Sequence, residues 1–176
     1  MSQMVLGLSV GTRYIGIAIF EGATLKSWRE KAFHGPWSAH KLDKILKAVR
    51  TEIELYPPVA LGLKCVHRSR SSSGLERLMK AINSLAEQRK LPVYKYPVGA
   101  LIRTFVTNKP RPTRKDMARA LASLYPILQT EAEQEAKSRI PYYMWLFEAV
   151  AAGLLCSRQI EVATIRQGAG QADALR

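Results

Sequence analysis

The chain has 176 residues, of which 47% are hydrophobic and 23% charged. This composition is typical of one globular domain and excludes a disordered or fibrous chain. The formal net charge is +13, and most of it is concentrated between residues 64 and 119, where 14 Lys and Arg stand against three acidic residues, a net charge of +11. A concentrated basic segment favours a polyanionic partner, and nucleic acid is the partner we expect.

The cysteines and apolar segments limit where the protein can work. Cys65 and Cys156 are far apart and form no CxxC pair, which argues against a disulfide scaffold and a zinc site. The N-terminus lacks the pattern of a signal peptide, and the most apolar segment, residues 142–156, is too short to cross a bilayer. We therefore expect an intracellular protein, cytoplasmic or nucleoid-associated, without a membrane anchor.

The N-terminal third predicts three strands and a helix. Residues 5–8 are typical of a buried strand, and a turn over residues 9–12 leads to a second strand, residues 14–20, that is nearly apolar on both faces. Residues 24–33 alternate as a third, more exposed strand. Apolar residues at 42, 45, 46, 49 and 53 form the stripe of an amphipathic helix, which Pro57 and Pro58 end.

The rest of the chain alternates strands and helices. Residues 59–66 and 93–96 predict two more strands, with a polar connection over 68–73 and a helix between them that Ser73 and Glu76 would cap. Residues 97–112 predict an irregular basic loop, and Thr113 caps the next helix. Residues 129–139 are polar and form a helix or a loop, whereas 142–156 predict an apolar helix packed on the sheet. This order predicts one α/β domain over residues 1–160, with a flexible tail over 161–176.

Three strands followed by helix–strand–helix–strand and a late apolar helix is the order of the RNase H-like fold. The opening strand pair resembles that of the RuvC-type Holliday junction resolvases, and also of the YqgF-type resolvase-like proteins, over LGLSVGTRYIGIAIF. Similarity to RuvC continues in the same order with LAEQRKLPVYKYPVGALIRTF, TRKDMARALASLYPIL and LFEAVAAGLL. The resemblance implies a mixed five-stranded sheet, with the first three strands antiparallel and helices on its faces.

The resemblance also implies a chemistry whose ligands are mostly missing here. In that family, carboxylates on the first strand, the fourth strand and the last helix bind two Mg²⁺ ions that cut a phosphodiester. This chain has Ser9 at the first position, Leu63 or Lys64 at the second, and Trp145 one turn before Glu148 on the last helix. Glu148 is thus the one retained acid and the single candidate catalytic residue. One carboxylate does not hold two dications, so we expect no metal site and a relative that does not cut.

Two further hypotheses concern charged residues. We expect Lys64 to occupy the former metal position and to pair with Glu148; the alternative is that Lys64 reaches solvent while Glu148 bonds backbone or water. Basic residues on the expected substrate side of the sheet are the candidate nucleic-acid contacts. These residues are Arg13, Lys64, Arg68, Arg70, Arg103, Lys109, Arg111, Arg114, Lys115 and Arg119.

The sequence therefore predicts a protein that binds branched or double-stranded DNA through its phosphates without cutting it and without a cofactor, with RNA as an alternative ligand. The resemblance implies a homodimer and a role in DNA recombination. Two other functions stay open at this level. One is an active Mg²⁺-dependent structure-specific endonuclease with a rearranged site. The other is a protein-interaction or RNA-binding module of a larger nucleoprotein complex.

Overall fold

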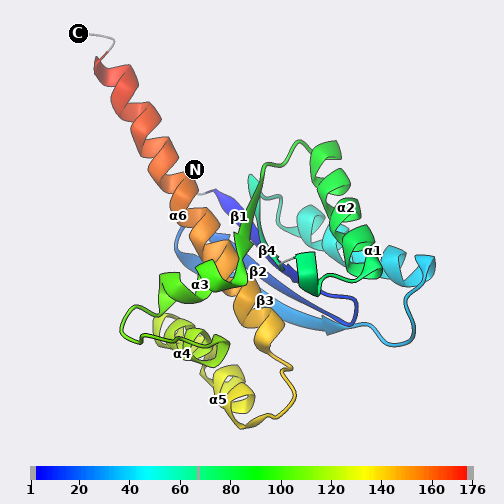
Figure 1. Ribbon diagram of the computed structural model, residues 1–176. Helices are drawn as coiled ribbons and strands as arrows, with labels where there is room; N and C mark the ends of the chain where they lie inside the picture. The colour runs from blue at the N-terminus through cyan, green and yellow to red at the C-terminus, as the bar shows by residue number, and fades with distance from the viewer. Residues whose placement is uncertain (1–2, 67, 174–176) are drawn as a thin grey trace.

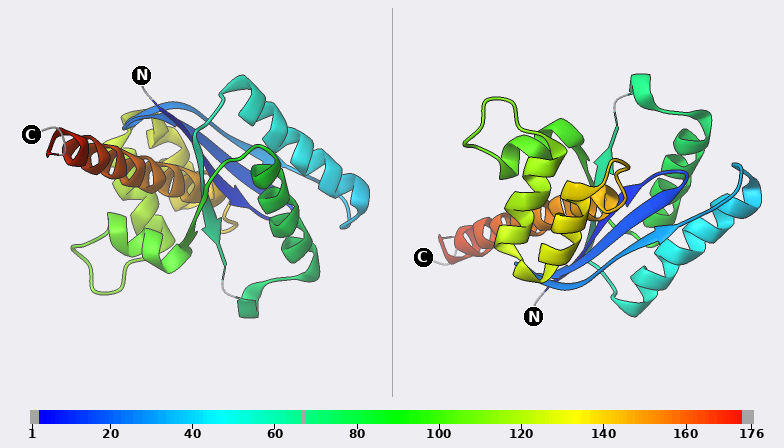
Figure 2. Two further views of the ribbon diagram at one scale, coloured as in Figure 1. Left: turned by 90° about the horizontal axis from the view of Figure 1, so that it is seen from above. Right: turned by 90° about the horizontal axis from the view of Figure 1, so that it is seen from below.

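A five-stranded sheet lies between two layers of helices in the computed structural model, which describes residues 3–66 and 68–173 (Figures 1 and 2). The strands are β1 (Met4–Val10), β2 (Tyr14–Glu21), β3 (Thr24–Ala32), β4 (Ala60–Cys65) and β5 (Val93–Pro97). Their order in the sheet is β3-β2-β1-β4-β5. The pairs β3–β2 and β2–β1 are antiparallel, and the pairs β1–β4 and β4–β5 are parallel. The predicted mixed five-stranded α/β arrangement is confirmed.

Helices cover both faces of this sheet. One face carries α1 (Ala39–Leu55) and α2 (Ser73–Gln88); the other carries α3 (Val98–Phe105), α4 (Arg114–Leu124), α5 (Gln129–Lys137) and α6 (Met144–Asp173) (Figure 2). Short 3₁₀ turns occur at Arg68–Arg70 and Pro126–Leu128. The first half of α6 crosses β2, β1 and β4, and its second half extends away from the sheet (Figure 1). No helix within the described residues is long and apolar enough to span a membrane.

The alternation of side chains along β2 divides the core into two layers. Ile15, Ile17 and Ile19 pack toward α1 and α2, whereas Ala18 and Phe20 pack toward α6. Successive side chains of a strand point to opposite faces, so a strand covered on both sides is apolar throughout. The two faces predicted for this strand are confirmed.

Glycines let α6 lie directly on the strands. A side chain at Gly7 or Gly16 would clash with the carbonyl oxygens of Ala149 and Trp145, and Gly62 is crowded by α6 in the same way. Because these positions have no Cβ, the helix backbone approaches the backbone of β1, β2 and β4 without side chains between them. This close contact brings the first turns of α6 next to the ends of β1 and β4.

Two predicted boundaries in the first half of the chain are wrong. β1 continues to Val10, so Ser9 lies in the strand rather than in the turn and is paired with Gly16 and Lys64. The cap of α2 is Ser72, whose Oγ accepts the N–H of Leu75, rather than Ser73. In both cases the element extends one or two residues beyond the pattern that predicted it.

The second half of the chain is more helical than predicted. Residues 98–105 form α3, with Leu101 buried, where an irregular loop was expected. Residues 129–137 form α5, the helical alternative of the two that the sequence left open. Thr113 caps α4 as predicted, in a reciprocal capping box with Asp116. α6 continues to Asp173, through most of the segment 161–176 that was expected to be a tail.

Candidate functional site

The ends of β1 and β4 and the first turns of α6 bring three of the predicted site residues together. Ser9 and Lys64 are neighbours in the parallel β1–β4 pairing. Ser9 Oγ donates a hydrogen bond of 2.8 Å to Glu148 Oε2, and Lys64 Nζ lies 2.9 Å from the same oxygen. Ser9, Lys64 and Glu148 are 0%, 2% and 1% exposed, so the ion pair forms away from water.

Two more side chains complete the group, which we call the Glu148 cluster (Ser9, Lys64, Arg114, Trp145 and Glu148). Arg114, the first residue of α4, places its Nε 3.3 Å from Glu148 Oε1. The Trp145 ring lies against the lysine, with Lys64 Nζ 4.4 Å from the ring centroid, a cation–π contact. The expected Lys64–Glu148 ion pair is therefore confirmed, and Lys64 does not reach solvent.

The donor set of the Glu148 cluster does not fit a pair of divalent cations. Mg²⁺ takes oxygen ligands, preferably anionic ones, and the cluster offers one carboxylate and one neutral hydroxyl. The ammonium of Lys64 already contacts the carboxylate oxygen that a cation would bind. Among residues 3–66 and 68–173, no three or more His, Cys, Asp or Glu side chains are arranged to hold a metal ion. The one carboxylate of the cluster is already paired with two cationic side chains, Lys64 and Arg114.

Half of the predicted nucleic-acid contacts are exposed on α3, α4 and the connection between them. The exposed basic residues of α3, α4 and their connection form what we call the α4 surface: Arg103, Lys109, Arg111, Lys115 and Arg119. A hollow of about 570 Å³ lies between the end of α3 and α4, and Thr107, Asn108, Lys109 and Arg119 are among the residues that line it. Amide, hydroxyl and basic groups are the donors from which phosphate oxygens accept hydrogen bonds.

Some of that positive charge is engaged within the protein. Asp116 pairs with Lys109 at 2.9 Å and with Arg119 at 3.5 Å. Hydrogen bonds from Thr113 and Lys109 hold the pKa of Asp116 below its usual range, so the carboxylate stays ionised. Lys115 donates to the carbonyl oxygen of Ser138 at 3.3 Å, which links α4 to the segment after α5.

The remaining candidates lie apart from the α4 surface. Arg13 is exposed in the β1–β2 turn and Arg70 is exposed in the 3₁₀ turn after β4. The side chain of Arg68 lies outside the described residues. Lys64 requires a correction, because its ammonium is buried and committed to Glu148 instead of facing a ligand phosphate.

Sequence reasoning missed one member of the Glu148 cluster. Arg114 was assigned to the nucleic-acid contacts, and its approach to Glu148 depends on how α4 packs beside α6, for which the sequence carries no local signal. Trp145 did carry a signal. It precedes Glu148 by three residues, and this spacing places both side chains on the same face of a helix.

Comparisons with known proteins bear on the fold. No protein-family model matches the sequence, and no curated protein is similar to it in sequence. Thermus thermophilus RuvC in complex with a Holliday junction substrate matches with a TM-score of 0.66 at 16% identity, over 86% of this chain and 91% of that chain. Another Thermus thermophilus RuvC structure gives 0.62 at 15% identity over the same shares, 86% and 91%.

A eukaryotic structure extends the likeness. The yeast mitochondrial Holliday junction resolvase Ydc2 matches with a TM-score of 0.56 at 13% identity, over 95% of this chain and 83% of that chain. Each match covers nearly the whole of both chains, and identities this low relate the folds and not the activities. The chain therefore has the RNase H-like fold of the RuvC-type Holliday junction resolvases.

Proposed function

We propose that this protein binds branched or double-stranded nucleic acid through its phosphates and does not cut it. One observation carries the second half of the proposal: Lys64 Nζ lies 2.9 Å from Glu148, the single carboxylate of the cluster. Hydrolysis of a phosphodiester in this fold requires metal ions that activate water and stabilise the leaving oxygen. A carboxylate already paired with an ammonium and a guanidinium is a poor ligand for such ions.

The α4 surface supports the first half. Five of the 14 Lys and Arg between residues 64 and 119 are exposed on α3, α4 and their connection, whereas those of α2 lie on the other side of the sheet. Arginine and lysine side chains on one face neutralise backbone phosphates and release counterions, which binds nucleic acid with little regard to sequence. Holliday junction resolvases, one of them in complex with its junction substrate, are among the structures similar to this chain, and this favours a branched ligand.

The test is to incubate the protein with a four-way DNA junction in the presence of Mg²⁺ or Mn²⁺ and to measure cleavage and a gel shift in parallel. We expect a shift without cleavage. Cleavage that Glu148→Gln abolishes would contradict the proposal and favour a working endonuclease. The absence of a shift with both DNA and RNA junctions would contradict it in the other direction and favour a protein-interaction module.

Other features stay predictions of the sequence analysis: the homodimer, the domain boundary near residue 160, the absence of a cofactor, the cytoplasmic or nucleoid location and the role in DNA recombination. Size-exclusion chromatography with light scattering measures the first of these directly. A monomer at micromolar concentration would remove the homodimer from the proposal without affecting nucleic-acid binding.

A further inference from the structure

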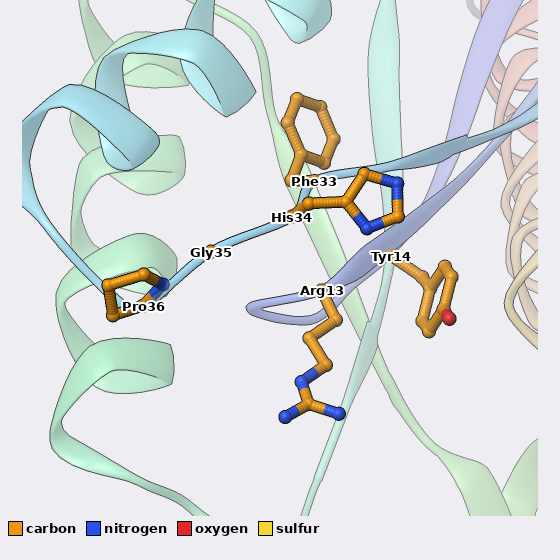
Figure 3. A pocket seen from close by; sticks show the side chains of 6 residues that line it. All are labelled: Arg13, Tyr14, Phe33, His34, Gly35 and Pro36. Carbon is orange, nitrogen blue, oxygen red and sulfur yellow. The ribbon is translucent and has the colours of Figure 1, made fainter.

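A pocket lies where the β1–β2 turn meets the connection from β3 to α1. Its volume is about 310 Å³, near the lower end of the range for small-ligand sites, roughly 300 Å³ and upward. The residues that line it are Arg13, Tyr14, Phe33, His34, Gly35 and Pro36. Figure 3 shows Arg13 and Tyr14 extending from the turn and His34 from the neighbouring segment, with the Phe33 ring directed the other way. The pocket therefore presents a guanidinium, an imidazole and a phenol.

Backbone and side-chain hydrogen bonds hold the two walls of the pocket in place. The N–H of Phe33 donates to the carbonyl oxygen of Arg13 at 2.7 Å, which ties the turn to the connection. Lys41 Nζ donates to the carbonyl oxygen of Gly35, also at 2.7 Å. Gly35 has a φ of +83°, a conformation that favours glycine, and it lies in open space. The pocket is thus formed before any ligand arrives.

Lys41 adds a charge that the protein does not balance. Its side chain comes from α1 and the residue is 5% exposed, yet no carboxylate pairs with it in the segments 3–66 and 68–173. An ammonium has three N–H donors, and the structure gives one of them to Gly35. Lys41 reaches the pocket only through Gly35 and is not one of its lining residues, so the guanidinium of the exposed Arg13 is the charge that the pocket itself presents to an anion.

Two rings add a surface for an aromatic ligand. Tyr14 is half-buried and held edge-on by Tyr142, with ring centroids 5.8 Å apart. His34 is exposed. Unpaired bases stack on tyrosine and histidine rings in proteins that recognise single strands and loops. A planar heterocycle joined to a phosphate, which is a nucleotide, matches both halves of the pocket.

The turn that forms the pocket also touches the Glu148 cluster. Gly11 lies against the Trp145 ring so closely that a Cβ there would come within 2.6 Å of it. The N–H of Gly11 donates to the carbonyl oxygen of Tyr14 at 2.9 Å, which fixes the turn between the cluster and the pocket. One short turn therefore connects the cluster to the wall of the pocket.

We propose that this pocket binds one unpaired nucleotide of the bound nucleic acid, with the base stacked on Tyr14 and His34 and the phosphate on Arg13. The inference rests on the proposed function and deepens it, because it names the feature that the protein selects. Continuous duplex has no unpaired nucleotide to offer, whereas bulged, gapped or frayed helices do. The pocket thus separates recognition of an unpaired nucleotide from the sequence-independent binding of the α4 surface.

The test compares three duplexes of one length: fully paired, with a single-nucleotide bulge, and with the same bulge lacking its base. We expect the wild-type protein to bind the base-bearing bulge about tenfold more tightly than the paired duplex, a factor within the range that one stacked base contributes. The abasic bulge should bind like the paired duplex. His34→Ala and Tyr14→Leu should lose the preference and keep the affinity for paired duplex. The matched control is His40→Ala, which removes an exposed histidine that lies on α1 and outside the pocket, and it should keep the preference.

Four outcomes overturn the inference. Equal wild-type affinity for paired and bulged duplex removes the pocket site and leaves the proposed function standing, whereas no affinity for any duplex removes both. A preference that survives in the double variant H34A/Y14L places recognition of the bulge elsewhere.

A competition experiment adds a second test: millimolar adenosine monophosphate should abolish the bulge preference and leave paired binding unchanged. If the monophosphate binds to a protein that shows no bulge preference, the pocket takes free nucleotides and the inference is wrong.

Discussion

Glu148 Oε2 receives both the Ser9 hydroxyl and the Lys64 ammonium, and Arg114 lies against Oε1. Two positive charges therefore face one negative charge, and the π-face of Trp145 lies beside the ammonium. Lys64 and Glu148 are buried and depend on each other, because the loss of one leaves the other without solvent or counter-charge, whereas the Arg114 side chain is 42% exposed. The Glu148 cluster consequently behaves as a unit in stability as well as in chemistry.

Glu148→Gln should destabilise the protein by about 3–5 kcal/mol, because Lys64 would remain buried without a carboxylate. Urea unfolding followed by circular dichroism measures the change. The double variant K64M/E148L should recover much of the loss, since it leaves no buried charge of the central pair. A Glu148→Gln variant as stable as the wild type would show that Lys64 moves to solvent at little cost.

A gain of metal binding tests the ligand deficit directly. The double substitution S9D/K64E puts carboxylates at the two strand positions next to Glu148, and three anionic ligands favour a divalent cation. We expect Mn²⁺ binding by electron paramagnetic resonance in this variant and none in the wild type. Adding E148Q to the double variant is the control and should weaken that binding. Two Mn²⁺ ions bound by the wild type would contradict the proposal that the site is silent.

Residue-scale prediction from sequence worked where the fold fixes the partners. Lys64 and Glu148 sit at positions that the resemblance identified, so their pairing followed from the strand and helix assignments. Arg114 and Lys41 differ, because their contacts depend on the packing of α4 and on the path of the β3–α1 connection. Neither of those has a local sequence pattern.

At the scale of elements, a buried carboxylate of α5 holds the turn that leads into α6. Glu135, which is 1% exposed, accepts the N–H groups of Tyr142 and Tyr143 at 3.1 and 2.8 Å. A second carboxyl group, Glu30 on β3, lies nearby, and burial followed by the charge of Glu135 raises its pKa from 4.5 to about 8. Glu30 is thus protonated at neutral pH so that it does not repel the Glu135 carboxylate.

The protonation of Glu30 makes stability depend on pH. Between pH 4.5 and about 8 the native protein holds a proton that the unfolded chain has released, so the free energy of unfolding falls as pH rises through this window. Glu30→Gln, which mimics the protonated form, should flatten that fall. The melting temperature measured from pH 5 to 9 checks it, with the exposed Glu133→Gln as control. The same pH profile in Glu30→Gln as in the wild type would contradict this assignment.

Elements with a long apolar stripe or a clear cap were predictable from the sequence, and the others were not. α1, α2 and α4 show a 3.6-residue repeat, and α4 begins at a capping box. α3 does carry an apolar stripe over positions 98, 101, 102 and 105, which the sequence prediction overlooked because the helix has only eight residues and no side-chain cap at Pro97. α5 is polar except for a few buried residues such as Ala132. Short helices of this kind are stabilised by packing against neighbours, which no window of sequence reports.

At the scale of the whole molecule, the uneven charge predicts how binding responds to salt. The double variant R103A/R111A removes two exposed cations of the α4 surface, whereas K47A/R50A removes two from α1 on the opposite face. The first should lower the slope of log affinity against log salt by about two, and the second should leave it unchanged. Equal slopes for both variants, measured by fluorescence anisotropy on paired duplex, would mean that the ligand does not lie on the α4 surface.

The arrangement of the sheet was the most predictable property of the whole chain, because the order of strands and helices restricts how the strands pair. The pocket at the β1–β2 turn was the least predictable. It joins residues 13–14 to residues 33–36, and their proximity depends on where β3 ends against the turn. Its lining residues have no spacing that would distinguish them from an ordinary loop.

The strand glycines that lie against α6, Gly7, Gly16 and Gly62, also affect the Lys64–Glu148 ion pair, although they are not part of it. Gly7 packs directly against the backbone of Gly153 on α6. A methyl group added at Gly7 would therefore push α6 away from the sheet or tilt it. Glu148 lies five residues before Gly153 on α6, so a displacement of α6 would move Glu148 away from Lys64. Gly7→Ala changes no polar or charged group, yet it would separate Glu148 from Lys64. The ion pair of the Glu148 cluster thus depends on how closely α6 packs on the sheet.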